Sequence, residues 1–413
     1  MKKRGGYIVR GLLVVMILLS LFLSFKLGID SGNQQKTHHP QSLLTNNRSA
    51  EELLLPTSFY EHVQNKVYEE TKESQLSRIM DEVQKLTFSA TSYLDHLSFE
   101  KIKEAQHFAE GLEFVYATPI TLRDFQEVYG LKGKLSVPDM TFNRIFINFE
   151  TREMIFINAD KKESWTLRTQ DSMAPLKERL EDKGMEVTLI SDTTLAYVPI
   201  KEQKIPKYSY ILEDQSYNVF IQALFTDPNS VETTGDAMHT IFKGNQNEEM
   251  RINNKNGVLS VWVPIETSDK ASDLLKTIEV VSRLGQDFGD LRYFSEKDGH
   301  YIYASFVEGY PILAKDYCGK VDVSLLRRQL RLLTNQSVVQ IPIPDSRTVT
   351  LPSGKEVLKT LKKHHINLSR VQRLQIGYEW EKAKTDTQAV TLIPTWFVYY
   401  DKQWTPLHDI IKK

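Results

Sequence analysis

The chain has 413 residues, of which 41% are hydrophobic and 25% charged, and its formal net charge is −1. This composition is ordinary for a globular protein, and the length suits two or three domains. Five basic residues and no acidic one lie within residues 1–26, which leaves −6 for the rest of the chain. A mildly acidic protein lacks the basic surface that nucleic acid requires, so we expect no nucleic-acid partner. The single cysteine, Cys318, excludes an internal disulfide and is expected to be structural.

An apolar run near the amino terminus, from Gly11 to Phe25, contains no charged residue. With its flanks it makes about 20 residues, or roughly 30 Å of helix, which is enough to cross a bilayer. Basic residues precede the run, so the positive-inside rule places the amino terminus in the cytoplasm. The alternative, a cleaved signal peptide, needs small residues after the run, but a lysine and bulky residues follow. We therefore predict a cytoplasmic tip and uncleaved single-pass membrane anchor over residues 1–27, followed by a large extracellular region.

One face of this predicted membrane helix is a candidate contact surface. Ser20 and Ser24 are four residues apart and share a helix face with Leu13, Met16 and Ile17. Small residues at this spacing let two membrane helices approach closely, which favours a helix partner in the membrane. The alternative is that the two serines are merely tolerated in a long apolar helix.

Residues 28–53 are predicted to be a flexible stalk, because they are polar and rich in Gln, Asn, Ser and His. Residues 54–203 are predicted to form the first of three extracellular α+β domains. Its predicted elements are strands Thr57–Val63 and Lys66–Thr71, a helix over Leu76–Leu86 capped by Ser74, a helix over Ser98–Glu110, strand Leu112–Ala117, a helix from Thr121 to Gly130, strands Arg144–Phe149 and Met154–Asn158, a helix over Met173–Lys183, and strands Glu186–Ile190 and Thr194–Pro199.

The charged segment 201–207 predicts a boundary before a central domain, 208–308, and a carboxy-terminal domain, 309–413. Both domains are predicted to be α+β and to share one plan, a helix followed by an antiparallel meander. Val321–Leu333 fits a helix and a strand equally well, and Pro394 predicts an edge or a bulge. The other predicted elements are helix Tyr217–Phe225, strands His239–Phe242 and Val258–Pro264, helix Ala271–Leu284, strands Leu291–Phe294 and Tyr301–Val307, a helix from Ser353 to Lys363, and strands Val371–Trp380 and Val390–Tyr400.

Catalytic signatures give one partial match, Ser98-Phe-Glu-Lys101, with the S-x-x-K spacing of penicillin-binding proteins. The Lys-Thr-Gly strand that this chemistry also needs is absent from the sequence, so Ser98 is better explained as a helix cap. Zinc-protease, nucleotide-binding and hydrolase-elbow motifs are absent as well. The pair His38–His39 lacks further metal ligands, and His364–His365 suits a helix end. The sequence therefore predicts no enzyme, no cofactor and no metal site.

A series of short motifs runs through the second half of the chain. They are Leu212-Glu213-Asp214, Gln215-Ser216-Tyr217, Ala223 to Pro228 (ALFTDP), Val307 to Pro311 (VEGYP), Leu351 to Glu356 (LPSGKE), Ile376-Gly377-Tyr378, and Leu392 to Val398 (LIPTWFV) with Trp404. Together with the amino-terminal anchor, their order and spacing resemble the YycH (WalH) family of Gram-positive bacteria. The resemblance covers essentially the whole chain and is strongest after Tyr208.

The resemblance implies a regulator without catalytic activity. Members of this family are anchored accessory proteins of the WalK–WalR (YycG–YycF) two-component system, which controls cell-wall metabolism. They act on the sensor histidine kinase WalK together with the related membrane protein YycI, partly through transmembrane helices. The family fold implies three extracellular domains, the last two similar to each other. The sequence leaves open the alternative of an anchored extracellular module that binds or modifies the wall.

Overall fold

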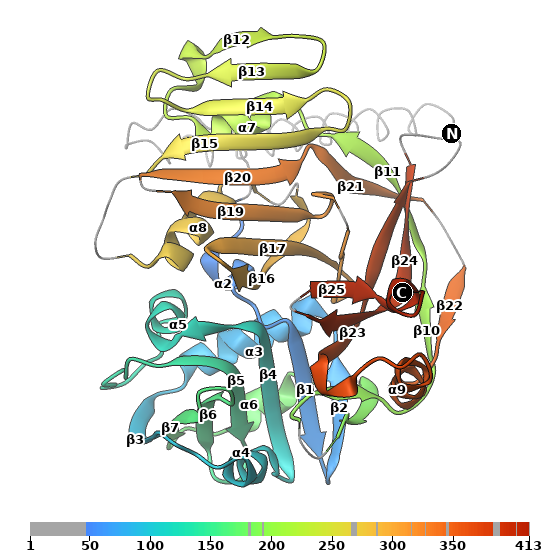
Figure 1. Cartoon of the computed structure of the whole chain (residues 1–413). Helices are drawn as coiled ribbons and strands as arrows, with labels where there is room; N and C mark the ends of the chain where they lie inside the picture. Colours follow the sequence, from blue (N-terminus) through green and yellow to red (C-terminus); the bar gives the residue numbers. More distant parts are fainter. Residues whose placement is uncertain are drawn as a thin grey trace, which may run out of the picture. The chain divides into compact units, whose positions relative to one another are not determined.

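We describe a computed structural model of the chain (Figure 1). The described residues are 47–180, 183–191, 194–265, 271–285, 288–314, 316–326, 328–343, 347–382, 389–401 and 403–412. Within these ranges, no helix combines the length and apolar character needed to cross a membrane. The predicted anchor, its candidate contact face and nearly all of the predicted stalk lie outside the described residues.

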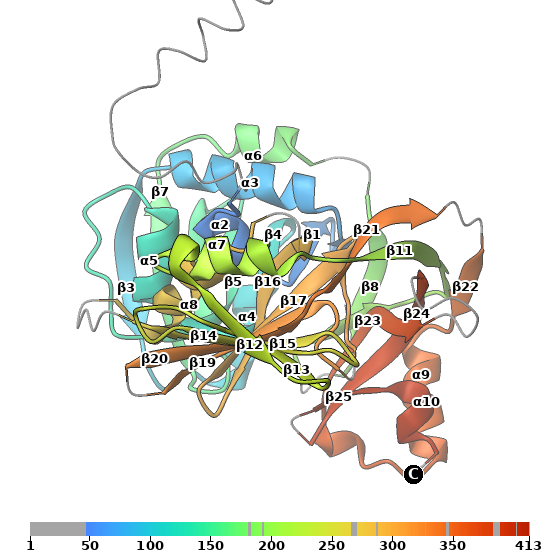
Figure 2. The ribbon, with the colours of Figure 1, turned by 90° about the horizontal axis from the view of Figure 1, so that it is seen from above.

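The first sheet has nine strands in the order β3-β7-β6-β5-β4-β1-β2-β8-β9, all antiparallel. Its strands are β1 (Ser58–Val63), β2 (Lys66–Glu70), β3 (Phe88–Leu94), β4 (Glu110–Thr121), β5 (Thr141–Asn148), β6 (Glu153–Asn158), β7 (Glu163–Thr169), β8 (Met185–Leu189) and β9 (Tyr197–Pro199). The associated helices are α2 (Ala50–Leu53), α3 (Glu73–Lys85), α4 (Phe99–Gln106), α5 (Leu122–Tyr129) and α6 (Ala174–Glu178). Figure 2 shows α3 and α6 side by side.

Local signals explain several of these elements. The predicted hairpin of β1 and β2 is confirmed, and its turn residues Gln64 and Asn65 have φ of 48° and 66°, as a tight hairpin turn requires. The predicted start of α5 is also confirmed, because the Thr121 hydroxyl accepts a hydrogen bond from the Asp124 N–H at 3.0 Å. Gly130 ends this helix at φ 57°, the left-handed conformation typical of a helix C-terminus.

Other predicted helix ends are wrong. Helix α3 begins at Glu73 after Lys72, so Ser74 lies inside the helix and does not cap it. The helix predicted over Ser98–Glu110 ends at Gln106, because β4 already begins at Glu110. Gly111 therefore lies in a strand, where a Cβ would meet the Ile147 carbonyl oxygen at 2.1 Å. The helix predicted over Met173–Lys183 is likewise shorter and covers Ala174–Glu178.

The second sheet has nine strands in the order β12-β13-β14-β15-β20-β19-β17-β16, with β18 paired to β17 (Figure 1). Its strands are β12 (Glu232–Gly235), β13 (His239–Lys243), β14 (Glu249–Asn253), β15 (Val258–Pro264), β16 (Asp290–Lys297), β17 (His300–Val307), β18 (Tyr310–Pro311), β19 (Lys320–Leu326) and β20 (Gln329–Asn335). Helices α7 (Tyr217–Leu224) and α8 (Asp273–Ser282) contribute Phe220, Ile221, Leu274 and Ile278 to its core.

The strands of this sheet come from both sides of the domain boundary that was expected between residues 308 and 309. The ambiguous segment Val321–Leu333 forms the hairpin β19–β20, and β20 pairs with β15 through Leu332 and Val261. Strand β19 pairs with β17, so residues after Gly309 complete the sheet that residues before it begin. The pairings of β20 with β15 and of β19 with β17 join strands that are separated in the sequence. The apolar alternation of Val321, Val323 and Leu325 therefore does not say which sheet receives the strand.

The third sheet runs β21-β11-β24-β23, and β25 pairs with β24. Its strands are β11 (Tyr208–Asp214), β21 (Ser337–Ile343), β23 (Val371–Lys382), β24 (Ala389–Tyr400) and β25 (Gln403–Pro406). A separate ribbon pairs β10 (Gln203–Pro206) with β22 (Thr348–Leu351). Strand β11 thus lies in the range expected for the central domain but joins the sheet formed by the carboxy-terminal residues.

Two further predictions for this region are confirmed. Helix α9 (Gly354–Lys363) begins with a capping box in which Ser353 and Glu356 each bond to the other's backbone N–H. Pro394 pairs with Tyr378 of β23, and on the other side of β24 the pairing with β11 ends at Leu392 and that with β25 begins at Phe397. Pro394 therefore lies where it has no ladder hydrogen bond to lose. A short helix, α10 (Leu407–Ile410), follows β25.

Two buried clusters dominate the described core. The larger spans the first and second sheets through α2, where Leu53 and Leu54 are fully buried. The other belongs to the third sheet, centred on Trp396 and Tyr378, and takes the buried residue Val198 from the first sheet. The prediction of an α+β fold with antiparallel strands is confirmed.

Candidate functional site

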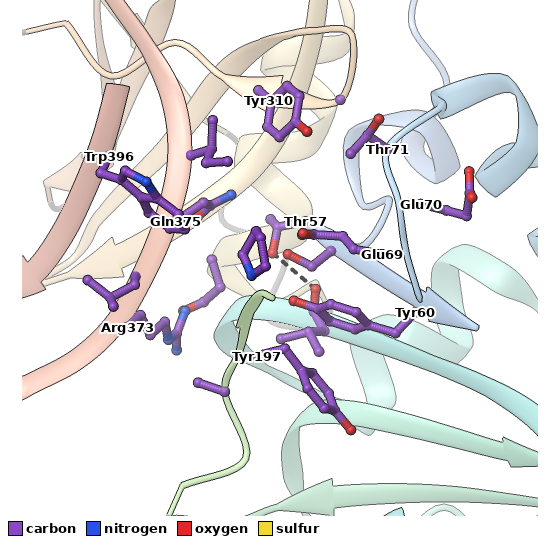
Figure 3. Close-up of a pocket in the computed structure, with 18 of the residues that line it drawn as sticks. Thr57, Tyr60, Glu69, Glu70, Thr71, Tyr197, Tyr310, Arg373, Gln375 and Trp396 are labelled. Atoms are coloured by element: carbon purple, nitrogen blue, oxygen red, sulfur yellow. Dashed lines mark hydrogen bonds between the residues drawn. The ribbon is translucent and has the colours of Figure 1, made fainter. Parts of the chain in front are cut away.

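A pocket of about 90 Å³ lies where the first sheet meets the third. Strands β1, β2, β4, β5 and β9 line one part of it, and β23, β24 and β25 line another, with the turn between β17 and β18 closing a further side. Figure 3 shows Tyr60 and Tyr197 from the first sheet near the middle of this pocket and Arg373 and Gln375 from the third. The pocket therefore belongs to neither sheet alone.

Two consecutive residues of β2, Glu69 and Glu70, contribute to its lining, and Figure 3 shows Glu69 directed toward the middle of the pocket and Glu70 directed away from it. Burial, together with the neighbouring charge of Glu70, raises the pKa of Glu69 to about 7. Tyr310 of β18 also faces these acids, and burial together with the charges of both raises its pKa well above the ordinary value. Glu69 is therefore a carboxyl that changes charge near neutral pH.

Its basic side is formed by Arg144 of β5 and Arg373 of β23. Arg373 donates a hydrogen bond to the Ala117 carbonyl of β4, and its guanidinium carbon lies 5.9 Å from the centre of the Tyr399 ring. Burial, with the nearby positive charge of Arg144, lowers the pKa of Arg373 to about 10. Arg373 thus ties the third sheet to the first through one backbone carbonyl.

Behind Arg144 lies a buried carboxylate, Glu113 of β4, which is fully excluded from solvent. It pairs with Arg144 and also accepts hydrogen bonds from Gln106 at 3.2 Å and Tyr197 at 3.2 Å, and it meets the His62 Nε2 atom at 3.1 Å. Burial alone would raise the pKa of Glu113, but the charge of Arg144 and the His62 contact hold it below the ordinary value. Glu113 is therefore a fixed anion that neutralises Arg144.

Three partners of this carboxylate line a second, wider pocket of about 690 Å³. His62 and Gln106 line that pocket, and Tyr197 lines both pockets. A buried polar network of this kind holds its members in one geometry when every group is satisfied. Glu113 consequently holds Tyr197, which lines both pockets, in one position.

A second group of buried charges joins the first and second sheets. Arg48 bonds to Glu73 of α3 at 3.0 Å and to Asp290 of β16 at 2.7 Å, and Arg292 bonds to Asp290 at 2.7 Å and to Glu73 at 3.4 Å. Burial and the adjacent Asp290 raise the pKa of Glu73 to about 7. Burial would raise the pKa of Asp290 too, but the two arginines hold it below the ordinary value. When both acids are ionised, the two carboxylates balance the two guanidinium groups.

The remaining chemistry-bearing residues have structural settings. Cys318 is fully buried, and burial with the charge of Asp316 raises its pKa to about 12, so the thiol stays protonated. The Ser98 hydroxyl accepts the Lys101 N–H at 3.3 Å, which makes the S-x-x-K match a helix cap. His364 ends α9 as predicted. Within the described ranges, no three His, Cys, Asp or Glu side chains are grouped as metal ligands.

Sequence reasoning did not find this pocket. The candidate residues it named, Leu13, Met16, Ile17, Ser20 and Ser24, lie outside the described residues. A usable signal did exist for the buried network, because Glu113 interrupts the apolar strand Leu112–Ala117 and must therefore be paired if that strand is buried. The pocket itself needs strands from distant parts of the sequence, and no local pattern records that meeting.

The comparison with protein families and the comparison with solved structures both find YycH proteins along most of the chain. The family model for the YycH protein, N-terminal domain, matches residues 9–183, and that for the YycH protein, C-terminal domain, matches residues 193–413. The crystal structure of YycH from Bacillus subtilis is similar in fold, with a TM-score of 0.68 and 14% sequence identity over 89% of this chain and 99% of that chain. An uncharacterized protein from Eubacterium rectale gives a TM-score of 0.32 and 11% identity over 52% of this chain and 84% of its own. A comparison with curated proteins finds no match.

Proposed function

Because the chain belongs to the YycH family, we propose that it is a non-catalytic, membrane-anchored accessory protein that regulates a sensor histidine kinase of the WalK type. The observation that carries the proposal is the share of the chain that the family models match, because the two matched domains occupy residues 9–183 and 193–413. The regulated process would be cell-wall metabolism, and a YycI-like membrane protein would be the second partner. No nucleic acid or cofactor takes part in this proposal.

The proposed topology has three parts. Residues 1–27 form the cytoplasmic tip and the membrane anchor, residues 28–53 form the stalk, and the sheets described above lie outside the cell. The charge bias before the apolar run and the lack of a cleavage motif after it support this arrangement. Protease added to wall-stripped cells should degrade the large region and leave a small membrane-held fragment. A mature protein that begins near Asp30 would contradict the proposal.

The anchor is proposed to carry part of the signal by packing against the kinase's membrane helices. Two apolar helices in lipid have little hydrophobic driving force to associate, because the lipid tails are equally apolar. Specific association therefore depends on small or polar residues that allow close packing. Replacing Ser20 and Ser24 together with Leu should weaken association with the kinase at least several-fold in a membrane two-hybrid or crosslinking assay, without reducing export. The control replaces Leu19 and Leu23, on another face, with Ile. Equal association of the double serine variant and the parent would contradict this contact.

The alternative of a wall-modifying enzyme finds little support in the pocket. Sites for small molecules usually enclose about 300–1,000 Å³; the pocket between the first and third sheets encloses about 90 Å³, whereas the second pocket, of about 690 Å³, does reach that size. Glu69 and Glu70 are consecutive on β2, and consecutive strand residues point to opposite faces of a sheet. Two carboxylates that flank a scissile glycosidic bond must instead converge from both sides of it. We therefore prefer the regulatory function.

One experiment tests the preferred function directly. The gene is deleted in its own host, and kinase output is followed through a reporter of the response regulator. We expect output to change on deletion, to return with the full chain, and to stay changed with a chain whose residues 1–27 are replaced by an unrelated anchor. Unchanged output on deletion would refute regulation, whereas full recovery with the foreign anchor would assign the signal to the extracellular region.

A further inference from the structure

The chain enters the described region through a residue that is held by two parts of the fold at once. Arg48 is the second described residue, and only 8% of it is exposed. Its guanidinium donates to Glu73 at 3.0 Å, to Asp290 at 2.7 Å and to the Gly289 carbonyl at 3.3 Å. Glu73 begins α3, which connects β2 to β3 of the first sheet, whereas Asp290 begins β16 of the second sheet. The start of the folded region is therefore fixed to both.

The residues that follow Arg48 are packed in place as well. Ser49 and Glu52 form the capping box that begins α2, and Leu54, directly after this helix, is fully buried. The hydroxyl of Tyr129, the last residue of α5, donates a hydrogen bond to the Leu54 carbonyl at 3.0 Å. Figure 1 shows α2 between the second sheet and the first, and α2 contacts α5, α8 and β16. A displacement of Arg48 therefore acts on a packed helix and not on a free loop.

Arg292 provides an internal comparison with Arg48. It is 2% exposed and bonds to the same two acids, at 2.7 Å to Asp290 and at 3.4 Å to Glu73. Both arginines therefore stabilise the junction, but Arg292 lies within β16, whereas Arg48 directly follows the segment that leads to the proposed anchor. Losing Arg292 weakens the junction and leaves the start of the folded region bonded through Arg48. Losing Arg48 weakens the junction and also frees that start.

We propose that Arg48 is a coupling residue, which passes movements between the anchor and the junction of the first and second sheets. The inference rests on the proposed function, because an anchored regulator has a signal to pass between the membrane and the extracellular region. With Arg48 bonded, a shift of the chain before it is applied to α3 and β16 together, since charge-assisted hydrogen bonds resist separation. With Arg48 released, the chain ahead of α2 takes up the same shift. The contact thus has two discrete arrangements, which coupling between distant sites requires.

Trypsin measures the released state in the full chain in detergent micelles, because Arg48 is itself a trypsin site and must leave its acids to enter the protease. Cleavage after Arg48, followed by mass spectrometry well below the thermal midpoint, tracks the released population. Glu73→Gln should raise its rate at least tenfold, and Glu73→Asp takes the place of that variant if it does not fold. The control Glu279→Gln breaks an exposed ion pair with Arg283 and should leave the rate unchanged. Parental rates in the Glu73 variant would overturn the proposal.

Kinase output then separates coupling from stability. At equal protein levels, Arg48→Gln should move the reporter by at least half of the effect of gene deletion, and Arg292→Met should move it several-fold less. Arg48→Lys keeps the charge without the planar fork, so it should give an intermediate output. Thermal midpoints of the same variants show that stability does not explain the order. Equal effects of Arg48→Gln and Arg292→Met, or parental output from Arg48→Gln, would overturn the coupling, whereas no effect of deletion itself would refute the proposed function on which it rests.

Discussion

The first sheet meets the second and the third in two different ways. Toward the second sheet, Arg48, Glu73, Asp290 and Arg292 form a closed set of ion pairs beside a shared apolar core. Toward the third sheet, Glu69 and Arg373 line a pocket, each without an ion pair among the described residues, and the core of the third sheet is separate. The first junction satisfies its charges internally, whereas the second leaves them for solvent or a ligand. We therefore expect the first junction to contribute more to stability than the second.

The largest effect should come from opening the closed set of charges. Arg292 is 2% exposed and contacts both acids, so Arg292→Met would leave these partly buried carboxylates with Arg48 alone. Breaking a buried pair from one side costs about 3–5 kcal/mol of unfolding free energy. Urea unfolding followed by tryptophan fluorescence measures the loss.

A matched control replaces Arg283, which forms an exposed ion pair with Glu279, by Met. Such a pair contributes about 0–1 kcal/mol. A second test adds Asp290→Asn to Arg292→Met and should recover part of the loss. If Arg292→Met costs no more than Arg283→Met, the closed set does not stabilise the junction.

A smaller effect should follow from Gly309→Ala, in the turn that closes the pocket. Gly309 has φ of 77°, and a Cβ there would lie 1.9 Å from the Thr71 carbonyl oxygen. Gly299 has the same φ of 77° but no atom within 4 Å of its Cβ position. Gly299→Ala should therefore cost only the backbone strain of about 1–2 kcal/mol.

Gly309→Ala adds the clash with Thr71 to the same strain and should cost about 1–2 kcal/mol more than Gly299→Ala. The thermal midpoints of the two variants give the comparison. Equal midpoints would mean that the turn moves away from Thr71 freely, and the junction would then be looser than its contacts indicate.

The smallest effect concerns pH. The pKa of Glu69 is raised to about 7, so the folded protein keeps a proton that the unfolded chain releases at lower pH. The folded state binds more protons in that window, and its stability falls as the pH rises from about 4.5 through 7. Glu69→Gln removes this share of the slope and should stabilise the protein at pH 8 by about 1–2 kcal/mol relative to the parent. The exposed Glu150→Gln is the control, and an unchanged slope in Glu69→Gln would contradict the assignment.

Local sequence signals predicted elements well where one turn or cap decides the structure. The Gln64-Asn65 turn, the Thr121 cap and the Ser353–Glu356 capping box are all confirmed, because their hydrogen bonds join residues two or three positions apart. Helix ends were predicted less well, as with Gln106, where the following strand competes for the same residues. The turn and the two caps are thus decided by residues that are neighbours in the sequence.

Sheet membership and the pocket could not be predicted in this way. Val321–Leu333, which contains nearly all of β19, fitted a helix as well as a strand, and β11 was not among the predicted strands; an alternating pattern would in any case suit either sheet. The partner of Arg144, Glu113, is set by the pairing of β4 with β5, and the partner of Arg373, Ala117, by the contact of two sheets whose strands lie far apart in the chain. A charged residue in a buried apolar strand predicts that a partner exists, but it does not predict which residue that partner is.

The pairing of β11 with β24 has a consequence for biosynthesis. Tyr208 pairs with Leu392, so the third sheet cannot close until nearly the whole polypeptide has left the ribosome. All nine strands of the first sheet lie before Lys201 and can fold earlier. In the interval, β11 exposes an unpaired strand edge, which is a template for wrong pairing with other chains. Until residues 389–392 are available, this edge of β11 therefore stays open, and we expect it to be the part of the third sheet that pairs wrongly with other chains.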